Sequence, residues 1–117
     1  MKIRPFESVL SKYKAVFFDS YGVLKNYNGL INGVEKTLKY LEKNGTEWLV
    51  LTNDASRSPI QLADKLRSAG LNAISSEKMI SSGMMAREFL RSKIRKGKVA
   101  YLGTEASAHY IEAAGLE

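Results

Sequence analysis

The chain has 117 residues, of which 44% are hydrophobic and 26% are charged, a composition typical of one globular domain. It contains no cysteine, which excludes disulfides, thiolate metal sites and cysteine nucleophiles, and its single histidine, His109, leaves little material for a zinc site or a histidine-based triad. The formal net charge of +6 favours anionic partners such as phosphorylated small molecules.

The first predicted element is a strand over residues 14–19, where four apolar residues run directly into Asp19. A continuous apolar run of this length is typical of a strand that is buried on both faces of a sheet. The next element is a helix over residues 32–45, which Asn32 caps and in which Glu35 stands in the register of a capping box. Apolar residues on one face of this helix predict that it packs against the sheet.

A second buried strand is predicted over residues 47–52. The helix that follows it spans residues 58–70, with Ser58 as its cap, Pro59 at its first position and Gln61 three residues after the cap. This spacing predicts a capping box, in which each of the two side chains bonds the backbone N–H group of the other residue.

The last third of the chain begins with a turn and continues as a helix from about Ser82. A third strand is predicted over residues 98–103, and a last helix over residues 104–115 is capped by Thr104. Strands and helices thus alternate along the chain. That order predicts an α/β fold with a parallel sheet, in which the chemistry gathers beyond the carboxyl ends of the strands.

Six basic residues crowd the segment 87–98. A solvated helix face followed by a basic turn explains them, and no nucleic-acid motif or aromatic platform accompanies them, so the pattern argues against a nucleic-acid partner. The first 14 residues are interrupted by charges and lack the apolar region of a signal peptide. No apolar run approaches the roughly 18 residues of a membrane span, so we expect a cytoplasmic protein without a membrane segment.

Polar side chains follow both of the first two predicted strands. Asp19 ends the first strand, and Thr52 and Asn53 stand at the end of the second. If the strands are neighbours, a carboxylate, a hydroxyl and an amide meet in one crevice, a combination that suits phosphoryl chemistry. The alternative is that Asp19 and Asp54 only stabilise the turns that follow the strands.

Three strings resemble known motifs of the haloacid dehalogenase superfamily of phosphohydrolases. The first string, FFDSYGVL, resembles motif one, and the second, LVLTNDASRSP, resembles motif two. The third string, AYLGTEASAHYIEAAGL, resembles the start of the α/β cap domain in class IIA, the branch of NagD and p-nitrophenyl phosphatase. The resemblance covers residues 13–117. It implies an incomplete, Rossmann-like core with a parallel sheet, with the N-terminal part of the core in residues 1–78 and the beginning of the cap in residues 79–117.

The resemblance also implies the roles of individual residues. Asp19 matches the nucleophile that forms an aspartyl-phosphate, and its other oxygen and the backbone carbonyl of Tyr21 match ligands of Mg²⁺. Thr52 matches the hydroxyl that holds the transferring phosphoryl group, and Asn53 is its neighbour. The implied reaction is hydrolysis of a small phosphate ester, such as a sugar or nucleotide phosphate.

Two departures from the family pattern keep alternatives open. Tyr21 stands where the phosphatases place a second aspartate as general acid and base, and the string DSYG is similar to the dehalogenase motif D-x-Y-G-T. The lysine of motif three and the acidic ligands of motif four have no counterpart in the sequence, which therefore resembles the N-terminal half of such a protein. The alternatives are a non-catalytic fragment, a pseudoenzyme or interaction module, or a haloacid dehalogenase. Association into a homo-oligomer is also left open.

Overall fold

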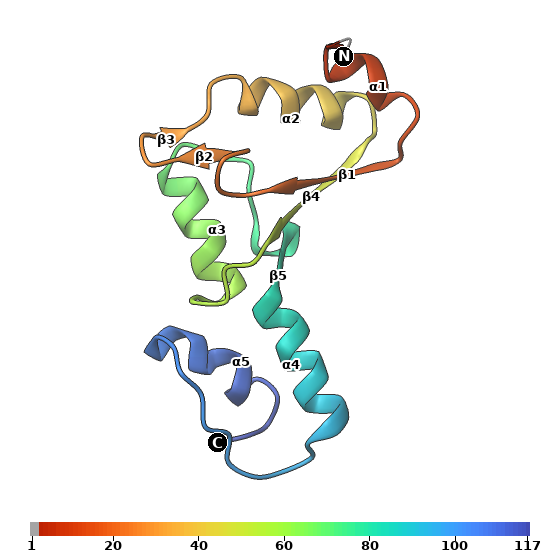
Figure 1. Ribbon diagram of the computed structural model, residues 1–117. Helices are drawn as coiled ribbons and strands as arrows, with labels where there is room; N and C mark the ends of the chain where they lie inside the picture. The colour runs from red at the N-terminus through yellow and green to blue at the C-terminus, as the bar shows by residue number, and fades with distance from the viewer. Residues whose placement is uncertain (1–2) are drawn as a thin grey trace.

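The computed structural model describes residues 3–117 as a small parallel sheet with helices packed against one face and a helical segment that leads away from it (Figure 1). The radius of gyration is 16.7 Å, against about 13–14 Å for a compact domain of this length, so the molecule is elongated. The elements are α1 (Glu7–Leu10), β1 (Ala15–Asp19), β2 (Lys25–Asn26), β3 (Gly29–Leu30), α2 (Val34–Lys43), β4 (Glu47–Thr52), α3 (Pro59–Ser68), η1 (Ser76–Lys78), β5 (Met79–Ser81), α4 (Ser82–Lys93), η2 (Glu105–Ala108) and α5 (His109–Glu112).

The main sheet has the order β1-β4-β5, and both pairs of strands are parallel. Asp19 is the partner of Leu51 in the register of β1 and β4, and Thr52 is the partner of Ser81 in that of β4 and β5. The predicted α/β class, the parallel sheet and the strands over residues 14–19 and 47–52 are thus confirmed. A separate antiparallel hairpin, β2 and β3, follows β1.

The third strand of the sheet is not the predicted one. Residues 98–103 form no strand; Val99 bonds the backbone of Glu117 instead, and Leu102 is fully exposed, because α4 carries this segment away from the sheet. The third strand is β5, which has three residues within a polar stretch and was predicted as a turn. Since β5 pairs with β4, the sheet extends to Ser81. We therefore propose that the core domain ends at Ser81 rather than at the predicted Lys78.

The helix starts follow the predicted chemistry in one of three cases. The capping box of α3 is confirmed: the Ser58 hydroxyl accepts from the Gln61 N–H at 3.3 Å, and the Gln61 side chain accepts from the Ser58 N–H at 3.0 Å. The predicted Asn32 cap is wrong, because Gly33, and not Asn32, precedes the first residue of α2. Gly33 has a left-handed φ of 89°, which glycine adopts readily, so the chain enters the helix one residue later than predicted. Thr104 does stand at the predicted position before the first residue of η2, but its hydroxyl makes no capping bond, and residues 104–115 form the shorter η2 and α5 instead of one helix.

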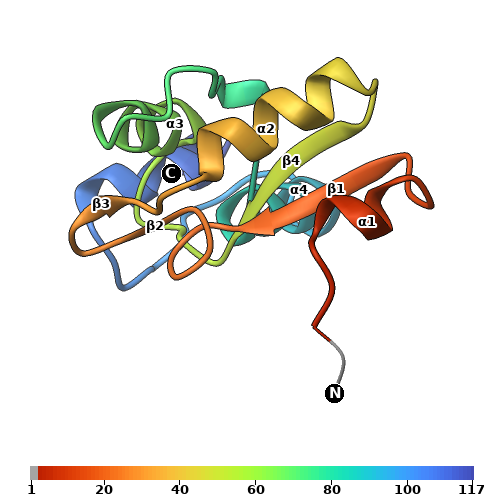
Figure 2. The same ribbon diagram turned by 90° about the horizontal axis from the view of Figure 1, so that it is seen from above.

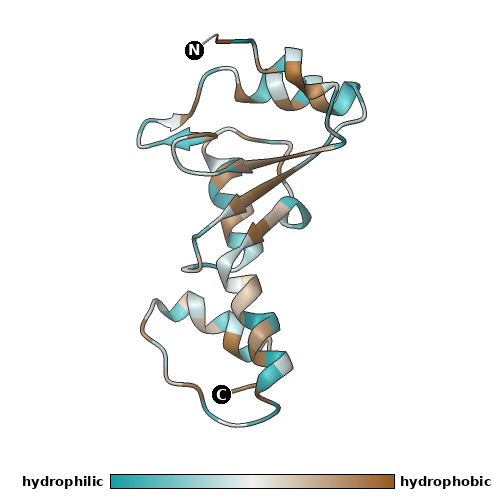
Figure 3. Cartoon of the chain, turned by 45° about the vertical axis from the view of Figure 1, so that its right-hand side comes forward, coloured by the Kyte–Doolittle hydropathy of each residue, from teal (hydrophilic) through white to brown (hydrophobic). Residues whose placement is uncertain are grey.

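The core lies on one face of the sheet. Helix α2 packs on β4 and helix α3 packs on β5. Figure 2 shows α2 and α3 on the same side of β1 and β4. The covered face and the two helices bury Trp48, Val50, Leu38, Leu41, Leu62 and Leu66. The opposite face is open: Phe17 is 56% exposed and Leu51 is 50% exposed, although both belong to the apolar strands that Figure 3 shows in brown.

No helix within residues 3–117 combines the length and the apolar character that crossing a membrane requires.

Candidate functional site

Asp19 is the last residue of β1 and the first polar residue after its apolar run. Its Oδ1 accepts a hydrogen bond from the N–H of Ser20 at 2.8 Å, and its side chain is exposed to solvent. The chain then turns at Gly22, whose φ is 88° and whose N–H donates to the Lys25 carbonyl at 2.7 Å. This tight turn separates Asp19 from the hairpin, and it leaves the Tyr21 side chain 63% exposed.

Thr52 and Asn53 lie at the carboxyl end of β4. The Thr52 side chain is buried, and its hydroxyl accepts from the N–H of Asp54 at 3.2 Å. Asn53 is exposed, and its carbonyl accepts from the Ser82 hydroxyl at 2.8 Å. The structure therefore brings the three side chains predicted at the strand ends, Asp19 included, to the same end of the sheet.

The two strand ends present their side chains differently. Because Asp19 is opposite Leu51, its side chain leaves the sheet on the open face. Thr52 is one residue further along β4, so its side chain leaves on the covered face, among the residues that α3 packs against. A single group that contacts both side chains must therefore sit beyond the tips of the strands rather than over either face.

A cluster of charged residues lines the covered side of this end of the sheet. The Asp54 carboxylate accepts from the N–H and the hydroxyl of Ser56 at 2.9 and 2.5 Å. Burial acts to raise the pKa of Asp54, but the two bonds from Ser56 and the charges of Lys65 and Arg57 outweigh it, so the pKa lies below its usual value. The cluster thus keeps Asp54 ionised.

Lys25 reaches this cluster from the hairpin. Burial lowers the pKa of Lys25 below its ordinary value, the charge of Lys65 lowers it further, and Asp54 acts in the opposite direction. A cavity of about 20 Å³ lies between these groups, Ser20 and Thr52, enough for about one water molecule. The sequence did not predict that Lys25 lies near Lys65 and Asp54, because 40 residues separate the two lysines and no motif links them.

The described residues offer few ligands for a metal ion. Within residues 3–117 no three side chains of His, Asp or Glu come together as a ligand cluster. His109 lies on α5, where its ring packs edge-on against that of Tyr110 at 5.4 Å between centroids. Asp19 offers one carboxylate, and Mg²⁺ is often held by one or two carboxylates together with water and substrate phosphate. The exposed oxygen donors at the end of β1 therefore fit Mg²⁺ as part of a site.

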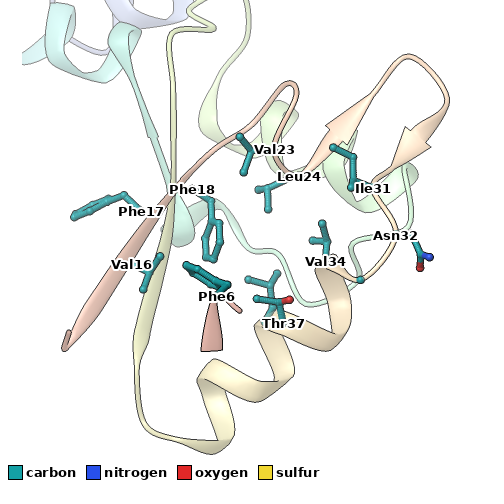
Figure 4. A pocket seen from close by; sticks show the side chains of 12 residues that line it. Phe6, Val16, Phe17, Phe18, Val23, Leu24, Ile31, Asn32, Val34 and Thr37 are labelled. Atoms are coloured by element: carbon teal, nitrogen blue, oxygen red, sulfur yellow. The ribbon is translucent and has the colours of Figure 1, made fainter. Parts of the chain in front are cut away.

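A mainly apolar hollow lies elsewhere. It has a volume of about 460 Å³ and is lined by residues of β1, of the turn after β1, of the segment before α2 and of α2 itself, and by Phe6, which packs edge-on against Phe18 (Figure 4). The polar residues in its lining are Asn32 and Thr37, and no charged side chain faces it. A phosphate ester would find no cation and no nucleophile there, so we do not assign this hollow to phosphate chemistry.

Known proteins match the chain over nearly its whole length. The sequence model of the family described as haloacid dehalogenase-like hydrolase matches residues 16–117. Phosphoglycolate phosphatase 2 of Arabidopsis thaliana is 30% identical over 113 residues, which cover 95% of this chain and 38% of that protein. The chain therefore spans less than half of the length of this relative.

Two solved structures share the fold. A possible sugar phosphatase of the HAD superfamily from Cytophaga hutchinsonii has a TM-score of 0.90 and 50% sequence identity, over 100% of this chain and 41% of its own. NagD from Escherichia coli K-12 has a TM-score of 0.75 and 28% identity, over 90% of this chain and 40% of its own. Both the fold class and the resemblance to the NagD branch are thus confirmed.

Proposed function

This chain belongs to the haloacid dehalogenase-like hydrolase family, and we propose that it carries the nucleophile and phosphate-binding residues of a phosphatase for small phosphate esters. The observation that carries the proposal is the parallel pairing of β1 with β4, which brings Asp19 to the same end of the sheet as Thr52 and Asn53. The relatives named phosphoglycolate phosphatase and possible sugar phosphatase support a small phosphorylated metabolite, such as a sugar or nucleotide phosphate, as the substrate.

The proposed first step is in-line attack by Asp19 on phosphorus. The N–H of Ser20 holds Oδ1 at 2.8 Å, so Oδ2 is the oxygen left to attack. A bond forms between Oδ2 and phosphorus, the ester P–O bond breaks, and the leaving alkoxide takes a proton from solvent water to depart as an alcohol. The Thr52 hydroxyl and the Asn53 side chain hold the phosphoryl oxygens, which carry most of the charge in this type of transfer.

The proposed second step releases phosphate. Water attacks the phosphorus of the aspartyl-phosphate, the bond between phosphorus and Asp19 Oδ2 breaks, and the attacking water gives up a proton to the solvent. The products are inorganic phosphate and the free Asp19 carboxylate, which is ready for another cycle.

We propose Mg²⁺ as the cofactor, held by the Asp19 carboxylate and the backbone carbonyl of Tyr21. When bound, the ion neutralises negative charge on the phosphoryl group. The part of the site contributed by this chain is one carboxylate and one carbonyl, which are hard oxygen donors of the kind that Mg²⁺ prefers. A cytoplasmic setting and association into a homo-oligomer also stay predictions.

Tyr21 favours a second candidate, a domain that has kept the fold and lost the chemistry. A phenol is a much weaker acid than a carboxylic acid and is therefore a poorer proton donor to a leaving alkoxide. Tyr21 is also largely exposed, and no neighbouring side chain within the described part of the chain bonds its hydroxyl. The phosphatase names of the relatives favour phosphatase over dehalogenase activity.

Replacing the nucleophile separates the two candidates. In the complete protein, Asp19→Asn should lower the turnover of p-nitrophenyl phosphate with Mg²⁺ by at least about a thousandfold, because an amide can neither attack phosphorus nor bind the cation as an anion. Asp64→Asn is the matched control, since Asp64 is an exposed carboxylate on α3 that pairs with Arg67. Equal turnover in both variants, or no Asp19-dependent turnover in the wild type, would favour the non-catalytic candidate.

A further inference from the structure

Three hydroxyl groups from the C-terminal part of the chain bind the loop that joins β4 to α3. Each donates to a backbone carbonyl, and the partners are 29, 48 and 53 residues apart in sequence. The bonds are Ser82 Oγ to Asn53 O at 2.8 Å, Thr104 Oγ1 to Ser56 O at 2.7 Å, and Tyr110 Oη to Arg57 O at 2.6 Å. The loop begins directly after Thr52, so its path decides where the proposed phosphate-binding groups lie.

Tyr110 makes the shortest of these contacts and is the most deeply buried of the three donors, at 4% exposure. Its hydroxyl has one proton, which goes to the Arg57 carbonyl. At the 2.9 Å contact with Ser81 Oγ, Tyr110 must therefore be the acceptor and Ser81 the donor. Ser81 Oγ in turn accepts from the N–H of Met84 at 3.3 Å. The hydrogen bonds thus form a chain from Met84 in α4 through Ser81 in β5 and Tyr110 in α5 to the loop, in which each hydroxyl accepts one bond and donates the next.

Gly83 makes room for the Tyr110 ring. A Cβ atom at position 83 would lie 2.2 Å from Cε2 of Tyr110, far inside van der Waals contact. Gly83 has ordinary helical backbone within α4, so the glycine is explained by this close approach of α5 rather than by its conformation. The ring thereby packs against α4 at a position from which its hydroxyl contacts both Ser81 and Arg57.

We propose that Tyr110 is a positioning residue for the phosphate-binding loop, holding it at Arg57 while Ser82 and Thr104 hold it at Asn53 and Ser56. The proposal rests on the proposed phosphatase function. Transfer of a phosphoryl group requires placement to within fractions of an ångström, and an anchored loop supplies it without binding substrate itself. Tyr110 thus acts through the loop and not on the reacting atoms.

The test compares Tyr110→Phe with Tyr13→Phe, which removes an exposed hydroxyl far from the loop. Hydrogen exchange is measured at the amides of Asp54 and Ser56, whose bonds to Thr52 and Asp54 report the loop geometry. We expect exchange about fivefold faster in Tyr110→Phe alone, the factor for one ordinary hydrogen bond. In the complete protein with p-nitrophenyl phosphate we expect kcat to fall about five- to tenfold and KM to change less than about twofold.

A second variant disturbs the contact between Tyr110 and Arg57 but keeps the Tyr110 hydroxyl. Gly83→Ala should displace the Tyr110 ring and accelerate exchange at the same two amides at least as much. Unchanged exchange in Tyr110→Phe, or faster exchange with unchanged kcat, would overturn the positioning role. If the wild type hydrolyses no phosphate ester but exchange is faster in Tyr110→Phe, the phosphatase proposal is refuted and the anchoring of the loop by Tyr110 stands. The failure of the proposed function can thus be distinguished from the failure of the positioning role.

Discussion

Asp19 and Thr52 end neighbouring parallel strands, yet their side chains leave the sheet on opposite faces. The Asp19 carboxylate is exposed, whereas the Thr52 hydroxyl is buried and holds the N–H of Asp54. A phosphoryl group that is bound by both must approach along the strand axis, beyond the tips.

The first prediction concerns the Thr52 hydroxyl. Thr52→Val keeps the shape of the side chain but removes the proposed hydrogen bond to a charged phosphoryl oxygen and the acceptor for the Asp54 N–H. We expect kcat/KM for p-nitrophenyl phosphate to fall about 10- to 100-fold in the complete protein, as for the loss of a hydrogen bond to a charged group. Thr52→Ser keeps the hydroxyl and should stay near the wild type. Equal losses in both variants would contradict the proposed role.

The second prediction concerns the missing proton donor. Tyr21→Asp should raise turnover tenfold or more, because a carboxylic acid can protonate the leaving alkoxide and general acid catalysis is commonly worth about 10²–10⁴. Since the Tyr21 side chain is exposed, the new carboxylate is not buried. Tyr21→Phe is the control, and it should match the wild type. If Tyr21→Asp is no faster than Tyr21→Phe, the lack of a proton donor does not limit the reaction.

The sequence predicts the elements whose signals are local. The apolar runs that end at Asp19 and Thr52 are strands, and Ser58 with Gln61 forms a capping box, because each pattern involves only neighbouring residues. Strand β5 has only three residues, and the partner strand rather than its own composition makes it a strand. Residues 98–103 have strand-like composition but lie beyond reach of the sheet, so propensity is overridden by position.

The candidate site also has one part that could be predicted from the sequence and one part that could not. The position of Asp19, Thr52 and Asn53 at one end of the sheet could be predicted, because the ends of parallel strands meet at one edge, and their roles stay predictions. The contacts of Lys25 with the Asp54 cluster and of Tyr110 with Arg57 could not, since they depend on how the hairpin and α5 fold back over the loop. No spacing in the sequence encodes such contacts.

The third prediction concerns acid stability. Because the pKa of Asp54 is lower in the folded protein than its ordinary value of about 3.9, its ionised form contributes stability that is present above that value and is lost as the pH falls through the folded pKa. Urea unfolding between pH 7 and pH 2.5 should therefore show Asp54→Asn less stable than the wild type at neutral pH, with the difference shrinking below about pH 4.

The control for this experiment is Asp64→Asn. Asp64 pairs with Arg67 on the exposed surface of α3, where an ion pair contributes little. Its removal should leave the pH dependence of unfolding almost unchanged. A difference between the wild type and Asp54→Asn that grows as the pH falls would show that the Asp54 carboxylate is not stabilised by folding.

The last prediction concerns the 117-residue chain by itself. Within residues 3–117, β1 pairs with β4 alone, and the open face of the sheet exposes Phe17 and Leu51 beside this unpaired edge. Such edges and apolar faces favour association, so we expect self-association that rises with concentration in light scattering after size-exclusion chromatography. We also expect negligible hydrolysis of p-nitrophenyl phosphate with Mg²⁺, because neither a motif-three lysine nor motif-four carboxylates compensate the phosphoryl charge.

A charged substitution on the open face tests the cause. Phe17→Lys should shift the chain toward the monomer, because it places a charge at the centre of the apolar face, whereas Tyr27→Lys, at an exposed position on the hairpin, should not. A wild-type chain that stays monomeric at every concentration would contradict the prediction of association. Steady turnover by that monomer that is lost in Asp19→Asn would contradict the prediction of inactivity, because Asp19, Thr52 and Asn53 would then be sufficient for phosphoryl transfer.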